Sequence, residues 1–487
     1  MNTTLIVFVV LYLLATLAVG IWAGTRIKNS TDFAIAGRSL PLVMVITTTF
    51  ATWFGAETVM GIPAKFVQGG LSAIVEDPFG AGMCLVLVGL FFATKLYRLN
   101  LLTIGDFYRQ RYGRGIEVFC SSVIILSYLG WVAAQITALG LVFGVLTNGE
   151  MSETTGMVVG TLAVLVYVVV GGFLAVAWTD FIQMIVLVVG LSVIAVFSAD
   201  LAGGADVVFA KIASKDLWRL LPEPSFKDVA FFIAAALTMM LGSIPQQDVY
   251  QRVMSAKDAK TARNGAVIGG ISYILFAFVP MFIVASAVVV MGDQALAIAR
   301  DDYRRLLPTF VMGKMPLVMQ ILFFGALLSA IKSTSSATLL APSTSFVENI
   351  LKNLRPQMSD RQQLLAMRLS IVGFAAVVLA YAIAMKGTPI YDLVSSAYQV
   401  TLVGAFVPLV MGLYWKPATT QGAIGSVAAG IGVWLLFMPQ VSTLGEAFPG
   451  QLAGLLAAFV GMVAGSLAPQ WLKSRHDADH LVRGLNA

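Results

Sequence analysis

The chain has 487 residues, of which 58% are hydrophobic and only 11% are charged, and its formal net charge is +6. Soluble domains carry about 25% charged residues, so this composition excludes a water-soluble globular protein and predicts an all-α protein that crosses a lipid bilayer many times. We attribute the positive balance to membrane topology and expect no nucleic-acid partner.

Thirteen apolar runs are long enough to span a bilayer. The first, residues 5–24, follows a start without a basic side chain, so we expect a retained helix and not a cleaved signal peptide. The ninth is too long for a simple span, and we expect it to begin as a helix outside the membrane. The remaining runs lie near 41–65, 76–95, 117–146, 156–176, 180–199, 228–251, 264–291, 311–347 (the ninth), 367–385, 393–414, 420–438 and 452–470.

The apolar runs contain no cluster of histidine and cysteine residues of the kind that supports catalysis. Cys84 and Cys120 lie in separate runs, and His476 and His480 lie in the polar tail. These positions predict no disulfide framework and no metal centre of the catalytic type. We therefore do not expect an enzyme.

Basic residues indicate the orientation of the chain. With the N-terminus outside, 20 of the 31 Lys and Arg residues fall in inner segments and ten in outer segments. This bias predicts a multi-pass protein of the cytoplasmic membrane with a cytoplasmic C-terminal tail. The remaining basic residue, Lys332, is the only one expected far from both surfaces.

Two runs are interrupted in a similar way. Residues 41–65 contain a Thr-rich patch, a glycine and Glu57, and residues 228–251 contain Gly242, Ser243 and Pro245 near their end. Paired interruptions are typical of transporters built from inverted repeats, and unwound backbone can bind cations. The alternative is that these residues only kink the helices.

If the interruptions correspond, the chain divides into repeats that begin on opposite sides of the membrane. The expected parts are a leading helix (1–30), a first repeat (31–200), an outer loop (201–227), a second repeat (228–415), two accessory helices (416–471) and a cytoplasmic tail (472–487). The accessory helices either pad the protomer or form a homodimer contact.

Several motifs resemble the sodium/solute symporter family, which includes carriers for proline, glucose, pantothenate and choline. They are DFAIAGRSL (32–40), TIGDFYRQRYG (103–113), GGFLAVAWTDFIQ (171–183), GSIPQQDVYQRVMSAKDAK (242–260), GALLSAIKSTSSATLLAPS (325–343) and LYWKPATTQGA (413–423). The resemblance extends from about residue 5 to residue 440. It implies a five-plus-five inverted-repeat (LeuT-like) core and uptake by alternating access.

The resemblance also implies a sodium ion between the first broken helix and an Ala-x-x-Ser-Ser/Thr motif. The matching positions are the carbonyls of Ala51, Phe54 and Ala330 and the hydroxyls of Ser333 and Thr334. Residues 330, 333 and 334 share one helical face, and these oxygens would hold sodium without a fixed negative charge. A Ser/Thr stripe is otherwise a packing device between membrane helices.

Asp180 matches an acidic residue that the family places near the inner sodium route. Its alternative role is that of an acid at a helix start, where the helix dipole stabilises it.

For the solute, Trp53 and Trp131 match aromatic positions of the choline branch, although Ala81 and Gln246 stand where that branch has further aromatic residues. Neutral hydrogen-bonding groups suit an amino acid, a sugar or a small carboxylate. We expect an amino acid or a compatible solute. The candidate solute-binding residues are Trp53, Glu57, Trp131, Gln246, Gln247, Tyr398 and Gln399.

Lys332 departs from the family pattern, in which this position is usually apolar. It lies about 200° around the helix from Ala330 and should point away from the ion site. Three roles are open for its side chain. It pairs with a buried acid (Glu57, Glu76, Asp77 or Asp180), its ammonium replaces the ion, or it meets an anionic group of the solute.

The sequence thus predicts a sodium-coupled symporter of a small organic solute. The alternatives are a proton-coupled or sodium-independent carrier, with Lys332 in place of the ion, and a transporter-like sensor.

Overall fold

The computed structural model describes residues 3–438 and 441–472, and in this part of the chain all regular elements are helical. The tail expected at 472–487 lies, apart from its first residue, outside the described residues. The uninterrupted spans are α1 (Thr3–Gly24), α8 (Arg114–Leu146), α13 (Ala259–Met291), α16 (Leu317–Ser345), α18 (Asp360–Ala384), α21 (Thr420–Leu436) and α23 (Gly450–Leu467).

Other spans are interrupted or distorted. They are α3 (Leu42–Trp53) with η2 (Glu57–Gly61) and α4 (Ile62–Gly69); η3 (Leu71–Ile74), η4 (Val75–Gly80), α5 (Ala81–Leu87), η5 (Val88–Phe92) and α6 (Ala93–Arg98); α9 (Glu153–Leu201); α11 (Phe226–Gly242) with α12 (Gln247–Ser255); and α19 (Ile390–Thr401), η8 (Leu402–Phe406) and α20 (Val407–Tyr414).

The remaining helices are short. They are α2 (Ser30–Ile35), η1 (Ala36–Arg38), α7 (Ile104–Tyr112), α10 (Ala205–Ser214), α14 (Asp293–Asp302), η6 (Tyr303–Arg305), α15 (Leu306–Lys314), α22 (Leu444–Ala447), and η7 (Phe346–Leu351) with α17 (Lys352–Leu354), which continue α16. The ninth apolar run is therefore divided as expected, because α15 ends before α16 begins.

The long helix α9 is two spans that meet at Gly172. A straight helix of its 49 residues would be about 73 Å long, more than twice the bilayer core. Gly172 has φ 49° and ψ −150°, a combination that is essentially restricted to glycine. The reversal precedes the boundary that the sequence predicted between 176 and 180.

Contacts with α1 establish this reversal. Near the end of α1, Gly20 packs against Tyr167 of the first arm, and Trp22 contacts Trp178 of the second arm. Closer to the start of α1, Tyr12 shares an apolar cavity with Val186 of the second arm. Because residues farther along the second arm contact positions nearer the start of α1, that arm runs antiparallel to α1.

The span count follows from this hairpin. Among the described residues, nine helices are long and apolar enough to cross a membrane, and two bent pairs pass the same test together. Since α9 supplies two spans and the shorter α21 adds one, the described chain has the thirteen predicted.

Both interruptions predicted from the sequence are sharp bends. The axis turns by 58° between α3 and the helix of residues 57–69, and by 45° between α11 and α12. A parallel bridge joins Leu40, just before α3, to Ala256, just after α12. The two broken helices are thus connected directly, although about 200 residues separate them in the chain.

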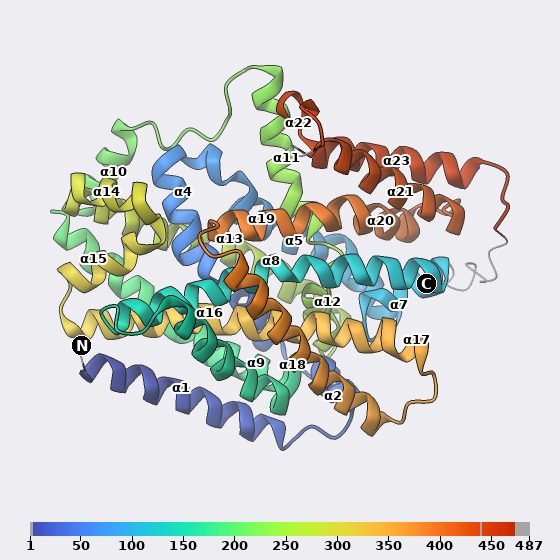
Figure 1. Cartoon of the computed structure of the whole chain (residues 1–487), viewed down its shortest axis with the longest axis horizontal. Helices are drawn as coiled ribbons and strands as arrows, with labels where there is room; N and C mark the ends of the chain where they lie inside the picture. The colour runs from blue at the N-terminus through green and yellow to red at the C-terminus, as the bar shows by residue number, and fades with distance from the viewer. Residues whose placement is uncertain (1–2, 439–440, 473–487) are drawn as a thin grey trace.

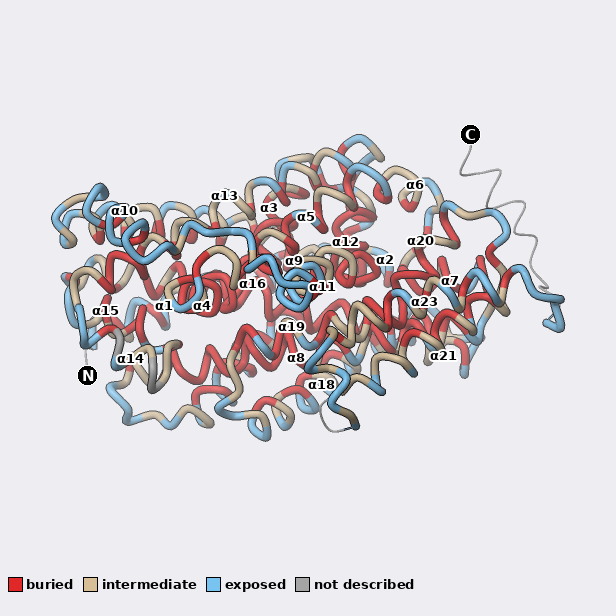
Figure 2. The backbone as a smooth tube through the Cα atoms, turned by 90° about the horizontal axis from the view of Figure 1, so that it is seen from above, coloured by how far each residue is buried: buried red, intermediate tan, exposed pale blue. Residues whose placement is uncertain are grey.

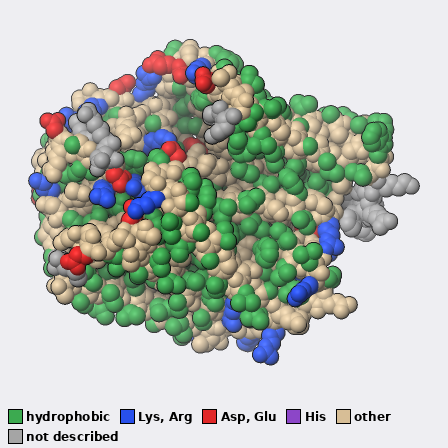
Figure 3. Space-filling model, viewed as in Figure 1, with side chains coloured by type: hydrophobic (Ala, Val, Ile, Leu, Met, Phe, Trp, Pro, Cys, Tyr) green, Lys and Arg blue, Asp and Glu red, His purple; other side chains and the backbone are tan. Residues whose placement is uncertain are grey.

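The helices run mainly along the long axis of the molecule (Figure 1), with α10, α14 and α15 at one end and α7 and α17 towards the other. Hydrophobic side chains cover the middle of the face in Figure 3, while most charged side chains lie towards its ends. The helices differ in how far they are buried (Figure 2). In α8, 78% of the most apolar stretch is buried, whereas in α1 and in α18 the buried share of that stretch is 22%.

Candidate ion and solute site

Asp180 links three helices beside the first break. Its Oδ1 accepts a hydrogen bond from the Ser333 hydroxyl of α16 at 2.5 Å, and its Oδ2 accepts one from the Thr48 hydroxyl of α3 at 2.5 Å. Because Asp180 is eight residues past Gly172 within the second arm of α9, the alternative of an acid at a helix start is wrong. The Asp180 carboxylate thus connects α3 and α16, the two helices between which the ion is expected.

The break in α3 leaves buried oxygen atoms without hydrogen-bond partners among the described residues. Phe54, with φ −89° and ψ 72°, ends the helix. The carbonyls of Ala51 and Phe54 accept no hydrogen bond from the described residues. The hydroxyl of Thr334 is buried without a partner, and a β-carbon at Gly55 would lie 2.7 Å from it. The structure thus brings Thr334 to the break, while Ala330 lies one helical turn before it in unbroken helix.

Three predicted aromatic residues form one cluster. The ring centroids of Trp53 and Trp131 are 5.7 Å apart, those of Trp53 and Tyr398 are 6.2 Å apart, and those of Trp131 and Tyr398 are 5.6 Å apart. All three side chains are buried. Since the rings contact one another, a solute must lie beside them or separate them.

Each indole of the cluster is bonded to a carboxylate. Trp131 Nε1 donates to Glu57 Oε1 at 2.9 Å, and Trp53 Nε1 donates to Asp248 Oδ2 at 3.1 Å. The cluster therefore has an aromatic surface with negative charge at its edges.

The predicted glutamines divide into two groups. The amide of Gln246 donates to Ser127, which lies one helical turn before Trp131 on α8, at 2.8 Å, and Gln246 Oε1 is buried without a partner. Gln247 instead accepts from the backbone of Ile104 at 2.9 Å, and Gln399 accepts from Trp434 of α21 at 3.3 Å. The structure does not place Gln247 and Gln399 with the rings, since their side-chain bonds face α7 and α21.

Sequence reasoning missed three residues of this region. Tyr128 donates to Asp248 Oδ1 at 2.5 Å and stacks on Trp131. Arg252 donates to the carbonyl of Asp248 at 2.8 Å and to the hydroxyl of Thr52. The sequence signal for these residues was the pair Asp248 and Arg252, an acid and a base four residues apart just after the second interruption.

Arg252 is a buried basic residue that the sequence did not predict to be buried. The sequence assigned Arg252 to an inner loop, but its side chain is buried and its guanidinium lies 5.2 Å from the ring of Phe173.

Lys332 has no acidic partner among the described residues. Its ammonium donates to the hydroxyl of Thr16 on α1 and lies 4.5 Å from the ring centroid of Tyr167. The prediction that it pairs with a buried acid is therefore wrong. The side chain points towards α1 and away from Ser333, as the helical angle predicts.

The four acids proposed for Lys332 have other partners. Glu57 accepts from Trp131, Glu76 from Ser395, Asp77 from Tyr273, and Asp180 from Ser333.

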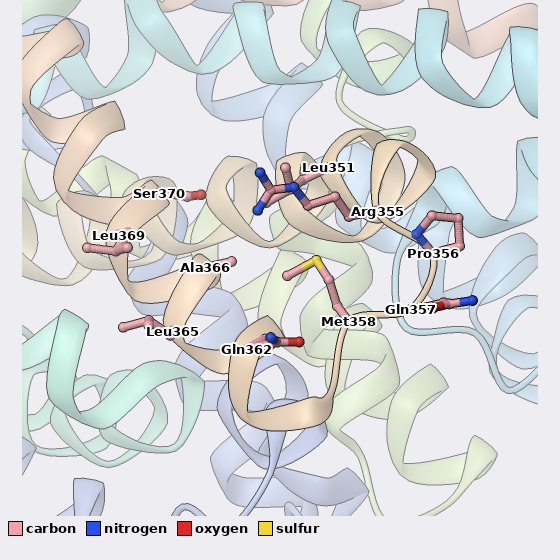
Figure 4. A pocket seen from close by; sticks show the side chains of 10 residues that line it. All are labelled: Leu351, Arg355, Pro356, Gln357, Met358, Gln362, Leu365, Ala366, Leu369 and Ser370. Atoms are coloured by element: carbon pink, nitrogen blue, oxygen red, sulfur yellow. The ribbon is translucent and has the colours of Figure 1, made fainter.

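A large surface pocket of about 780 Å³ lies between the end of α17 and α18 (Figure 4). Its lining includes Arg355, Met358 and Leu369, and no residue predicted for the ion or the solute contributes to it.

Comparison with known families decides the identity of the chain. The model of the sodium:solute symporter family matches residues 33–430. The chain belongs to the sodium:solute symporter family. One similar protein is the high-affinity choline transporter 1 of Homo sapiens. It is 27% identical to this chain, and the match covers 88% of this chain and 75% of that protein.

Other sodium:solute symporter relatives are matched over nearly their whole length. The high-affinity proline transporter PutP of Bacillus subtilis is 27% identical, with 91% of this chain and 94% of that protein covered. The sodium/pantothenate symporter of Haemophilus influenzae is 25% identical, with 95% and 96% covered.

Solved structures show the same fold. A sodium-coupled sialic acid symporter superimposes with a TM-score of 0.83 at 20% identity, covering 95% of this chain and 97% of the other. Mhp1, a nucleobase-cation-symport-1 family transporter, gives 0.62 at 16% identity, covering 94% and 99%. The chain thus has the five-plus-five LeuT-like architecture, and this sodium:solute symporter couples solute uptake to sodium.

Proposed function

We propose that the imported solute is small and carries a quaternary or protonated ammonium group, as amino acids and choline-type compatible solutes do. The contact cluster of Trp53, Trp131 and Tyr398 carries this proposal. A cation over an aromatic face gains about 0.5–2 kcal/mol, with tryptophan the best ring. An indole whose N–H donates to a carboxylate presents a more electron-rich face.

Charges around the cluster support the same solute class. Glu57 and Asp248 place two carboxylates at its edge, and Arg252 lies beside Asp248 but not beside Glu57. When no cation is bound, a purely anionic solute would be repelled by this excess. The Tyr398 hydroxyl and Gln246 Oε1, both buried without partners, offer hydrogen bonds to a polar group of the solute.

For the ion, we propose sodium ligands at Ala51, Phe54, Ala330, Ser333 and Thr334, between the two repeats of residues 31–200 and 228–415. An ion that contacts both repeats stabilises the solute-accepting conformation, which is how binding becomes coupled. Proton coupling through Lys332 has less support, because its ammonium faces Thr16. No observation favours a sensor.

Ser333→Ala tests the sodium site. It removes the hydroxyl that faces Asp180, so sodium and solute binding should weaken together. The measurement is the melting temperature of the purified protein in sodium against potassium at constant ionic strength. A ligand at 100 times its Kd stabilises the native state by about 2.7 kcal/mol, which such a melt detects.

Ser335→Ala is the matched control, because its buried hydroxyl donates only to the carbonyl of Ile331 within α16. Its sodium response should equal that of the parent. Solute affinity that does not depend on sodium, in the parent as in Ser333→Ala, would rule out coupling.

The solute class is tested with a charged solute and its neutral isostere. Choline and 3,3-dimethylbutanol differ mainly in the charged nitrogen, so choline should bind at least about tenfold more tightly, a difference of about 1.4 kcal/mol. Trp131→Leu should remove most of that preference. Equal affinity of the two compounds for the parent would contradict an ammonium-binding cluster.

A further inference from the structure

Three side-chain oxygens converge on one point at the break between α3 and η2. A β-carbon built on Gly55 would lie 2.6 Å from Glu57 Oε2, 2.7 Å from Thr334 Oγ1 and 2.8 Å from Gln135 Oε1. The oxygens come from η2, α16 and α8, and all three side chains are buried. Only a glycine at position 55 leaves room at this point.

Each oxygen has capacity that the protein does not use. The Thr334 hydroxyl has no partner. Gln135 Oε1 accepts one hydrogen bond, from the backbone of Ala56 at 2.9 Å. Glu57 Oε2 accepts one, from Gln135 Nε2 at 2.5 Å. Because a carboxylate or carbonyl oxygen has two lone pairs, each group can accept one more bond.

The charge of Glu57 is not balanced by any neighbour with a positive charge. Its side-chain partners are Trp131 and Gln135, both neutral, and no ion pair involves it in the described part of the chain. A buried carboxylate without a compensating cation is unfavourable. The same point therefore offers oxygen ligands and lacks one positive charge.

We propose that Glu57, Gln135 and Thr334 bind a sodium ion beside Gly55, with Glu57 supplying the negative charge. Hard cations such as calcium, whose radius is close to that of sodium, lie about 2.3–2.6 Å from oxygen ligands. The inference rests on the proposed sodium-coupled function and deepens it, since Thr334 belongs to both ligand sets. It replaces the expectation that the ion is held without a fixed charge.

Glu57 then connects the ion to the aromatic cluster. Its Oε2 faces the ion, and its Oε1 accepts from Trp131 Nε1 at 2.9 Å. Sodium binding would fix the carboxylate and with it the orientation of the indole. This contact gives the ion a direct route to solute affinity.

Glu57→Gln tests the site, with sodium alone as the ligand. The variant keeps the size of the side chain and removes its charge, so the sodium concentration that gives half of the thermal stabilisation should rise at least tenfold. Glu76→Gln is the matched control: Glu76 is a second buried glutamate, but it accepts from Ser395 on α19. Its sodium response should equal that of the parent.

Gly55→Ala is an independent variant that changes no charge. Its methyl group would occupy the point shared by the three oxygens, so the sodium response should fall as in Glu57→Gln. Both variants are compared at pH 6 and pH 8. If Glu57→Gln changes only the response to pH and keeps the sodium curve of the parent, Glu57 binds a proton and the inference is overturned.

The outcomes separate this inference from the function on which it rests. A parent that sodium does not stabilise contradicts the sodium-coupled function itself. A parent that sodium stabilises, with Ser333→Ala impaired and both Glu57→Gln and Gly55→Ala unaffected, contradicts only the role of Glu57.

Discussion

Lys332 is buried where α1, α9 and α16 meet, and its ammonium has a hydroxyl and an aromatic ring as partners. Cation–π attraction and one hydrogen bond do not replace the hydration of a full charge. Burial of Lys332 therefore lowers the stability of the fold, and the proposed ion site does not explain why a lysine lies here.

Lys332→Met should be neutral or more stable than the parent by about 1–4 kcal/mol, because apolar replacement of a buried charge removes its desolvation penalty. The melting temperature in potassium measures this. The sodium-induced shift should be unchanged, since the ammonium faces away from Ser333. A variant that responds to sodium when the parent does not would show that the ammonium replaces the ion.

Thr16→Val isolates the one hydrogen bond of the ammonium. Removing the acceptor should destabilise the parent by about 1–3 kcal/mol, because the buried donor stays unsatisfied. In the Lys332→Met background the same change should have almost no effect. Equal losses in both backgrounds would mean that Thr16 acts through packing.

Some site residues could be predicted from the sequence and others could not. Ala330, Ser333 and Thr334 share a helical face by their spacing, and the family resemblance assigns them to the ion; Trp53 and Trp131 match aromatic positions of the same family. Gln247 and Gln399 stay predicted solute-binding residues, but their side-chain hydrogen bonds to Ile104 and Trp434 could not be predicted, because helical rotation at a break cannot be read from composition. Arg252 was missed because a basic residue near a span end is ordinarily a surface residue.

At the scale of helices, α3 and α12 are fastened to each other. Trp53 of α3 donates to Asp248 of α12, and Arg252 of α12 donates to Thr52 of α3. The Leu40–Ala256 bridge adds backbone bonds at their ends. A movement of one broken helix must therefore carry the other or break this network. The sequence predicted both interruptions but not the bonds between them, since those depend on tertiary packing.

Gly172→Ala should disrupt the hairpin of α9. The glycine has φ 49°, and a β-carbon there would lie 2.6 Å from the backbone oxygen of Phe33. Backbone strain of this kind costs about 1–3 kcal/mol, and the clash adds to it. The thermal melt in detergent should show a loss of at least about 2 kcal/mol.

Gly373→Ala is the control for Gly172→Ala. Gly373 is an exposed position within α18, where a β-carbon meets no atom within 4 Å. This change should be neutral or stabilise by up to about 1 kcal/mol, the usual gain of alanine over glycine in a helix. If Gly172→Ala costs no more stability than Gly373→Ala, the turn at Gly172 tolerates a side chain.

At the scale of the whole molecule, orientation in the membrane is a prediction from basic residues. Cys84 and Cys120 are both buried, so the parent should react little with a membrane-impermeant maleimide. On intact cells, Ser214→Cys in the 201–227 segment should be labelled and Gln357→Cys should not. Labelling of Gln357→Cys before permeabilisation would reverse the assigned orientation. The homodimer contact after residue 420 also stays a prediction.

The turn at Gly172 has a consequence for membrane insertion. Residues 171–173 are all buried, so the chain reverses without a polar loop. A nascent chain normally stops between two spans at a hydrophilic connection, and none exists here. We therefore expect the two arms of α9 to enter the bilayer together as a helical hairpin. For the same reason, this reversal offers no position at which a protease could cut the folded chain.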